Sequence, residues 1–159
     1  MIVVALQLNG RPVELSVAPG DTLLDALRVA GGATEVKRGC GEGVCGTCTV
    51  LLDGEPVSSC LVFAVQADGA TVTTVRALAE ADALHPLQEA FLDHAAAQCG
   101  FCTPGMLLTA TWHLERNPAA TREELREALS GNLCRCTGYT AILDAIEAYR
   151  DGRAETNGG

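Results

Sequence analysis

Eight cysteines are the residues of this 159-residue chain that are best suited to chemistry, and they fall into two tight groups. The first group consists of Cys40, Cys45, Cys48 and Cys60, and the second of Cys99, Cys102, Cys134 and Cys136. Thiols clustered in this way indicate metal binding or redox chemistry rather than packing. A disulfide scaffold lacks its usual context, because the chain starts with a strand-like run and not with a secretory signal.

The first group has the spacing Cys-x4-Cys-x2-Cys, followed by one more cysteine, which is typical of a plant-type [2Fe–2S] cluster. Its loop also holds four glycines, at positions 39, 41, 43 and 46. Glycine allows positive φ angles and lets backbone N–H groups approach sulfur closely, as a loop around an anionic cluster requires. Zinc, unligated thiols and disulfides are the alternatives, but zinc sites favour two separated pairs. A Rieske centre would need two histidine ligands, and none of His85, His94 and His113 lies within four positions of a cysteine.

The second group consists of two short pairs, Cys99-x2-Cys102 and Cys134-x-Cys136, separated by 31 residues that read as helices. Each pair comes just before a predicted helix, whose N-terminal end carries a partial positive charge that would stabilise an anionic cluster. The spacing alone leaves iron–sulfur and zinc both open. Arg135, between the last two cysteines, either offsets the charge of a cluster or is an ordinary surface arginine.

The first half of the chain reads as a β-rich scaffold. Alternating runs at 2–8 and 13–17 flank Asn9-Gly10, which is a strong hairpin signal. A short helix over 22–30 follows, with Asp21 as its expected N-cap. A second hairpin is predicted over 49–58, with its turn at Asp53-Gly54, and a further strand over 70–75.

The second half reads as four helices. Pro86 marks the first turn of one, and Thr103-Pro104 opens the next, which runs to about Arg116. The segment Thr121–Glu124 is a capping box that starts the third helix, and the fourth spans about 139–150.

Strands followed by helices predict an α+β fold, with a domain boundary where the composition shifts, within 76–84. The expected domains are 1–76 and 77–150, and a flexible tail is expected at 151–159.

The net charge is −9, from 20 acidic and 11 basic residues. This balance argues against a nucleic-acid partner, because phosphates require a basic surface. An ordinary solvated surface and a charge-specific partner both remain open. No apolar run approaches the roughly 18 residues of a membrane span.

Longer motifs make the chain resemble a known family, the small iron–sulfur subunits of the molybdenum hydroxylases, which include xanthine dehydrogenase, aldehyde oxidoreductase and aerobic carbon monoxide dehydrogenase. The similarity covers about residues 2–150. The matching stretches are residues 39–50, Ser59-Cys60, residues 85–88, residues 98–105 (Gln-Cys-Gly-Phe-Cys-Thr-Pro-Gly) and residues 131–139 (Gly-Asn-Leu-Cys-Arg-Cys-Thr-Gly-Tyr).

The resemblance implies a ferredoxin-like β-grasp domain that holds the first [2Fe–2S] cluster and a four-helix domain that holds the second. It implies that Gln98 and Cys136 contact the molybdopterin of a large subunit, although Gln98 alone could equally be a helix-end amide bonded to backbone. It also implies a medium subunit that binds FAD, with electrons running from molybdenum through the second and then the first cluster to flavin. Thr47 stands where many members have alanine, and it is not expected to touch a ligand.

The favoured function is therefore an electron-transfer subunit of a heteromeric molybdenum hydroxylase, with no substrate chemistry on this chain. A free-standing ferredoxin-like carrier and a structural zinc module are the alternatives. A cytoplasmic location is the default expectation, and export with a signal-bearing partner stays open. The substrate could be carbon monoxide, a purine, an aldehyde or an N-heterocycle, because the molybdenum subunit determines it.

Overall fold

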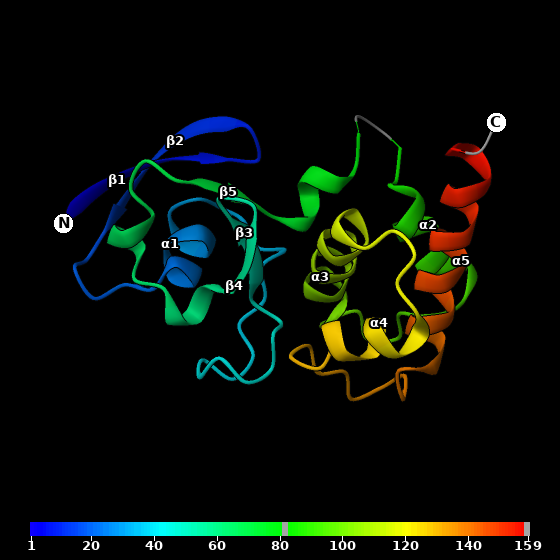
Figure 1. Ribbon diagram of the computed structural model, residues 1–159. Helices are drawn as coiled ribbons and strands as arrows, with labels where there is room; N and C mark the ends of the chain where they lie inside the picture. Colours follow the sequence, from blue (N-terminus) through cyan, green and yellow to red (C-terminus); the bar gives the residue numbers. More distant parts are fainter. Residues whose placement is uncertain (81–82, 158–159) are drawn as a thin grey trace.

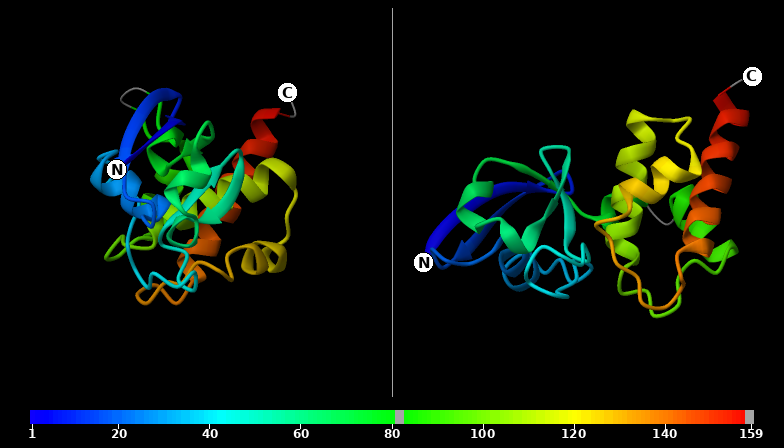
Figure 2. Two further views of the ribbon diagram at one scale, coloured as in Figure 1. Left: turned by 90° about the vertical axis from the view of Figure 1, so that its left-hand side faces the viewer. Right: turned by 60° about the horizontal axis from the view of Figure 1, so that its bottom comes forward.

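The computed structural model describes residues 1–80 and 83–157. Residues 81–82, in the expected boundary region 76–84, and residues 158–159, in the expected tail, lie outside the described residues. The strands lie at the end of the molecule that carries the N-terminus, and the later helices lie at the opposite end (Figure 1, Figure 2). None of the described helices has the length and hydrophobicity that crossing a membrane requires.

Five short strands form one mixed sheet in the order β2-β1-β5-β3-β4. They are β1 (Ile2–Leu8), β2 (Arg11–Val17), β3 (Thr49–Leu52), β4 (Glu55–Ser58) and β5 (Thr71–Thr73). β5 pairs with β1 in parallel, and the other neighbouring strands are antiparallel. Both predicted hairpins are confirmed, and Asn9 and Asp53 have the positive φ angles, 51° and 50°, that suit tight hairpin turns. The sheet agrees with the ferredoxin-like part of the expectation.

Helix α1 (Leu23–Val29) covers the sheet with side chains that are fully buried, at Leu23, Leu24 and Leu27. Its N-cap is Thr22, whose Oγ1 accepts a hydrogen bond from the Asp25 N–H at 3.1 Å. The prediction of Asp21 as the cap is wrong. The Asp21 carboxylate accepts from the Ala18 N–H at 2.7 Å and so holds the turn before the helix.

The predicted strand at 70–75 is shorter in the structure, where β5 ends at Thr73. Thr74 Oγ1 accepts from the Arg76 N–H at 3.4 Å and begins a 3-10 turn, Val75–Leu78. The backbone therefore leaves the sheet at Thr74 and continues toward the helical part of the chain.

Four helices follow the sheet: α2 (Pro86–Asp93), α3 (Thr103–Arg116), α4 (Arg122–Ala128) and α5 (Thr140–Asn157). The capping box at the start of α4 is confirmed, because Thr121 accepts from the Glu124 N–H and Glu124 accepts from the Thr121 N–H. His85 and Gln88 form a corresponding box at the start of α2.

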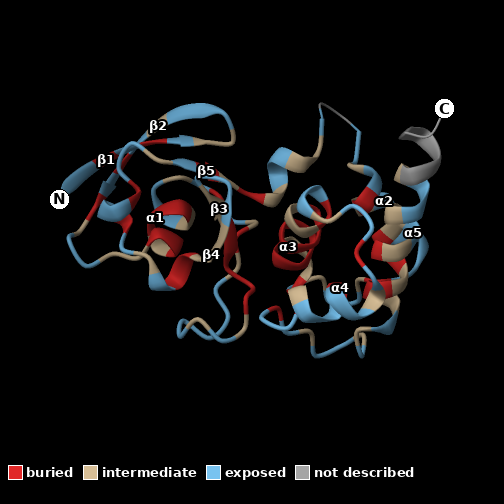
Figure 3. Cartoon of the chain, viewed as in Figure 1, coloured by how far each residue is buried: buried red, intermediate tan, exposed pale blue. Residues whose placement is uncertain are grey.

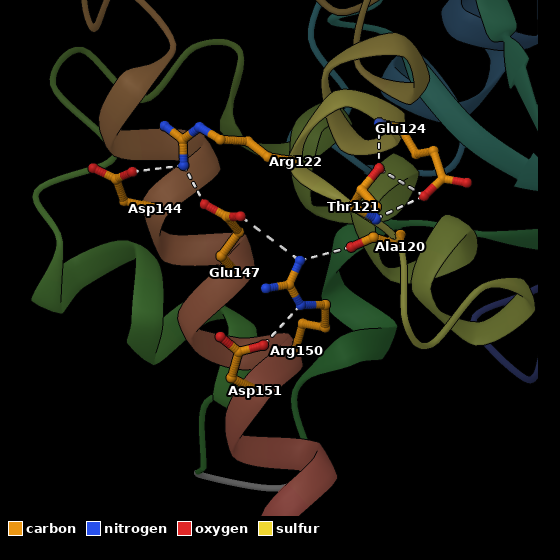
Figure 4. A network of polar contacts seen from close by, with 8 residues as sticks. All are labelled: Ala120, Thr121, Arg122, Glu124, Asp144, Glu147, Arg150 and Asp151. Carbon is orange, nitrogen blue, oxygen red and sulfur yellow. Dashed lines mark hydrogen bonds and ion pairs between the residues drawn. The ribbon is translucent and has the colours of Figure 1, made fainter.

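Helix α5 is longer than predicted, since it continues past Arg150 to Asn157. Polar contacts hold the part of α5 before this extension, from Asp144 to Arg150, against the start of α4 (Figure 4). Arg150 donates to the Ala120 carbonyl at 2.6 Å and to Asp151 at 2.8 Å, and Arg122 pairs with both Asp144 and Glu147. The sequence from 151 to 157 contains no proline, and the helix can therefore continue where a tail was expected.

The buried side chains form two clusters, one between the sheet and α1 and one among the four later helices (Figure 3). Helix α3 lies between them, because it packs on β3 and β4 as well as on α2 and α4. Arg116 of α3 also reaches Glu55 of the β3–β4 hairpin at 2.7 Å. Cysteines of both groups lie near this junction, because the N–H of Leu133, which precedes Cys134, donates to the Cys45 carbonyl.

Candidate metal centres

Three cysteines of the first group lie on the loop between α1 and β3, and the fourth, Cys60, lies just past β4. Backbone N–H groups of the loop point at sulfur. Glu42 and Cys45 donate to Cys40 Sγ at 3.3 and 3.4 Å, and the Cys40 N–H donates to Cys45 Sγ at 3.4 Å. Such donors stabilise negative charge on sulfur, as a thiolate ligand requires.

Their surroundings shift the pKa values of two thiols of the first group in opposite directions. Hydrogen bonds from the N–H groups of Glu42 and then Cys45 lower the pKa of Cys40 to about 6. Burial raises the pKa of Cys60, which lies within hydrogen-bonding reach of Cys48. A bound metal removes this difference, because a coordinating thiol is deprotonated outright.

The glycines of this loop are required by its geometry. A Cβ on Gly39 would lie 2.7 Å from both Cys45 Sγ and Thr47 Oγ1, which is closer than side-chain carbons approach. The other three have positive φ angles, namely 74° at Gly41, 76° at Gly43 and 66° at Gly46. The predicted glycine cradle is therefore present.

Thr47 contacts a cysteine, so the expectation that it touches no ligand is wrong. Its Oγ1 lies 3.3 Å from Cys45 Sγ and 3.4 Å from the Lys37 carbonyl oxygen, and only 6% of the residue is exposed. A thiolate can only accept, so the Thr47 hydroxyl would donate to a ligating Cys45. A threonine two positions after a cysteine was the available signal, but only the loop conformation turns its side chain toward sulfur.

The second group forms two pairs from distant parts of the chain. Cys136 Sγ lies 3.5 Å from Cys99 Sγ, and Cys102 lies within hydrogen-bonding reach of Cys134. Cys102 is the N-cap of α3, as the sequence predicts, while Cys136 lies four residues before α5. A hollow of about 240 Å³ is lined by Cys99, Cys102 and Cys134 of this group and also by Thr47 of the first loop.

Burial and hydrogen bonding also separate the thiols of the second group. Burial, followed by the hydrogen bond with Cys134, raises the pKa of Cys102 to about 12. Burial opposes ionisation of Cys134 too, but hydrogen bonds from Thr137 bring its pKa below the ordinary value. The Cys134 N–H donates to Tyr139 Oη at 3.0 Å, and this bond holds the loop closed. Sequence reasoning did not assign this role to Tyr139, which has a positive φ of 70°.

The residues expected to contact a molybdopterin lie on an exposed edge. Cys99, Cys136 and Gln98 are all exposed, and so is Arg135. Gln98 is five residues beyond the end of α2, so the alternative view of it as a helix-end amide does not fit its position.

The two cysteine loops meet through their backbones. The Leu133 N–H donates to the Cys45 carbonyl at 2.9 Å. The neighbouring Asn132 Nδ2 donates to the Gly46 carbonyl at 3.0 Å. One loop therefore binds two successive carbonyls of the other.

The eight cysteines form four pairs: Cys40 with Cys45, Cys48 with Cys60, Cys99 with Cys136, and Cys102 with Cys134. In the part of the chain that the structure describes, no three potential ligands gather around one point. Pairs fit a [2Fe–2S] cluster, in which each of two irons takes two cysteines. Together with the cradle of N–H donors, this arrangement suits the iron–sulfur interpretation at both groups.

Comparison with known protein families gives two matches. Residues 6–79 match the family model described as a 2Fe-2S iron-sulfur cluster binding domain. Residues 74–147 match the family model described as a [2Fe-2S] binding domain.

Individual proteins are similar over nearly the full chain. The nicotine 6-hydroxylase small subunit of Paenarthrobacter nicotinovorans is 53% identical over 141 residues, which cover 89% of this chain and 85% of that protein. The nicotinate dehydrogenase small FeS subunit of Eubacterium barkeri is 49% identical over 145 residues, covering 91% and 92%. A chain in the crystal structure of quinoline 2-oxidoreductase from Pseudomonas putida 86 is 49% identical and superposes with a TM-score of 0.92, covering 97% of this chain and 96% of that one.

Proposed function

Because the chain belongs to the family of small iron–sulfur subunits of the molybdenum hydroxylases, we propose that it relays electrons between two partner proteins. It is the iron–sulfur component of a molybdenum-containing oxidoreductase and carries two [2Fe–2S] clusters. When bound, such clusters accept and release one electron at a time, so a two-electron oxidation can be unloaded in steps. Substrate is oxidised on a partner and not on this chain.

The ligands of the first cluster are Cys40, Cys45, Cys48 and Cys60, and those of the second are Cys99, Cys102, Cys134 and Cys136. Domain 1–76 holds the first set on a ferredoxin-like β-grasp scaffold, and domain 77–150 holds the second on four helices. The flexibility of 151–159 stays a prediction. The observation that carries this assignment is the pairing of the eight thiols, together with the backbone bond that joins the loop of Cys45 to the segment just before Cys134.

The second set faces the large molybdopterin-binding subunit. Exposure of Gln98, Cys99 and Cys136 on one edge supports this orientation, because a group on another protein can reach only exposed atoms. Gln98 and Cys136 are the proposed contacts with the pterin. Cys40, also exposed, belongs to the set that faces a medium subunit with FAD. The complex is proposed to be cytoplasmic.

Metal analysis of the chain, expressed with its partner subunits, tests the proposal. About four irons and four acid-labile sulfides per chain are expected from two clusters. Stoichiometric zinc in place of iron would contradict the iron–sulfur assignment at that site. Gel filtration should show the chain in a complex with a molybdenum-containing subunit, and a lone monomer with full iron content would instead support the free-standing carrier.

A further inference from the structure

The structure assigns a positioning role to Asn132, which holds the two cysteine sets in register across the junction between the sheet and the helices. The function proposed above gives this residue no part. The inference rests on that function, since it takes the two cysteine sets as electron carriers. The Asn132 side chain fixes the contact between the two sets.

Asn132 and Leu133 donate hydrogen bonds to two successive peptide groups of the first loop. The Leu133 N–H donates to the Cys45 carbonyl at 2.9 Å, and Asn132 Nδ2 donates to the Gly46 carbonyl at 3.0 Å. The backbone of Asn132 is itself anchored, because its N–H donates to the Leu129 carbonyl at 2.9 Å at the end of α4. The helical half of the molecule therefore holds the first loop at two adjacent points.

The side-chain amide of Asn132 is buried at the junction between the sheet and the helices. Only 5% of the residue is exposed, and its Nδ2 also lies 3.3 Å from Thr49 Oγ1. The Thr49 hydroxyl in turn donates to the same Gly46 carbonyl at 2.7 Å. Two buried side chains from different halves of the chain thus converge on one oxygen, and removal of either leaves buried polar atoms short of partners.

The hydrogen bond next to Asn132, from the Leu133 N–H to the Cys45 carbonyl, is a short connection along the chain between the two sets. Cys45 belongs to the first set, and Leu133 is covalently joined to Cys134 of the second. One hydrogen bond and one residue therefore separate the two ligands. With clusters bound, transfer of one electron across this contact would oxidise the cluster held by the second set and reduce the cluster held by the first, each by one electron, and no bond or proton would have to move.

A purely structural role for Asn132 would predict a different outcome from a positioning role. Loss of a structural contact would lower stability or iron content and leave transfer between intact sets unchanged. Loss of positioning would leave both sets filled, with their separate reduction potentials, but would weaken the interaction between them.

The test uses the full chain loaded with iron and sulfide, as wild type and as Asn132→Ala. In the variant, hydrogen exchange of the Leu133 amide, measured by mass spectrometry on the 129–135 segment, should be about tenfold faster, which corresponds to about 1.4 kcal/mol. Iron content and both midpoint potentials should stay at the wild-type values. The magnetic splitting between the two reduced centres in low-temperature EPR should decrease, and electron redistribution after rapid one-electron reduction should slow.

Asn117→Ala is the matched control, because Asn117 ends α3 away from the cysteines and should leave all these values unchanged. Asn132→Leu serves as the second variant if Asn132→Ala does not assemble, because it nearly keeps the volume of the side chain but removes the Nδ2 donor to Gly46. Unchanged exchange, splitting and redistribution in a fully loaded Asn132→Ala or Asn132→Leu protein would overturn the inference. A wild-type chain without two iron–sulfur signals would instead refute the proposed function and, with it, the premise of the inference.

Discussion

Gly105, in the first turn of α3, lies against Gly46 of the first cysteine loop, so closely that a Cβ on Gly105 would meet the Gly46 carbonyl oxygen. The same Cβ would lie 3.1 Å from Asn132 Nδ2. Two glycines that are 59 positions apart, the difference between 105 and 46, thus allow the backbones of the two halves to touch. A side chain on Gly105 would therefore push α3 and the first cysteine loop apart.

Gly105→Ala and Gly46→Ala should therefore destabilise the chain by about 1–3 kcal/mol each. Gly46→Ala should be the worse, because Gly46 also has a φ of +66° and its Cβ would lie 2.7 Å from Asn132 Nδ2. Denaturant unfolding followed by circular dichroism measures the effect. Gly131→Ala is the control, since a Cβ there meets nothing within 4 Å. Equal stability of all three variants would show that the contact is looser than described.

Cys45→Ser and Cys102→Ser should each damage one cluster and spare the other, because the two residues belong to different sets. The EPR spectrum of the dithionite-reduced protein should lose or shift one signal in the first variant and the other signal in the second. Iron content should fall by up to about half in each. Each variant serves as the control for the other, and loss of both signals from a folded single variant would contradict the two-site assignment.

Thr47→Val should lower the reduction potential of the first cluster. The valine lacks the hydroxyl that lies 3.3 Å from Cys45 Sγ, and a hydrogen bond to sulfur stabilises the more negative, reduced state. Loss of about 1 kcal/mol corresponds to about 40 mV for a one-electron couple. A redox titration monitored by EPR measures both clusters at once, so the second cluster is the internal reference. Thr47→Ser should restore the wild-type potential, and a serine variant that behaves like valine would exclude the hydroxyl as the cause.

The stability of the chain should decrease as pH falls from about 7 to about 5, partly because of His85. Burial, and then the charge of Arg153, lower the pKa of this imidazole, although Glu115 and Glu80 oppose the shift. The unfolded chain therefore binds a proton at a higher pH than the folded chain does. The contribution of His85 to the free energy of unfolding is complete above the ordinary histidine pKa of about 6.5. It is lost as the pH falls from there toward the lower pKa of His85 in the folded chain.

His85→Asn keeps an N-cap acceptor for α2 but removes the titration, so it should flatten this part of the pH profile. Urea unfolding at a series of pH values measures the slope. His94→Asn, at the exposed end of the same helix, is the control for replacing a histidine. If His85→Asn does not change the slope of stability against pH, groups other than His85 cause the pH dependence.

Arg150→Ala should destabilise the chain more than Arg126→Ala does. Arg150 is 19% exposed and donates to the Ala120 carbonyl at 2.6 Å, so its loss leaves a part-buried carbonyl without this partner. The expected cost is about 1–2 kcal/mol. Arg126, 67% exposed, pairs with Glu123 at the surface, and its replacement should change stability by less than about 0.5 kcal/mol. Thermal unfolding of the two variants side by side gives the comparison, and equal melting temperatures would contradict it.

Much of the local structure follows from the sequence, because short-range rules determine it. The Asn9-Gly10 and Asp53-Gly54 turns, the Thr121–Glu124 box and the proline at the start of α2 all lie where neighbouring residues require them. The N-cap of α1 did not follow, since Asp21 and Thr22 are both capping residues and only the turn before the helix decides between them. The end of α5 did not follow either, because no proline marks a stop between 151 and 157 and the helix continues to Asn157.

For the candidate site, spacing and glycine placement were enough to indicate an iron–sulfur cradle at Cys40, Cys45, Cys48 and Cys60. The pairing of Cys99 with Cys136, the Thr47 contact with Cys45 and the grip of Asn132 on Gly46 came only from the tertiary structure. A ligand loop of nine residues constrains itself through its own backbone. A contact between residues 86 positions apart depends on how the sheet and the later helices pack against each other, and no local pattern in the chain encodes that packing.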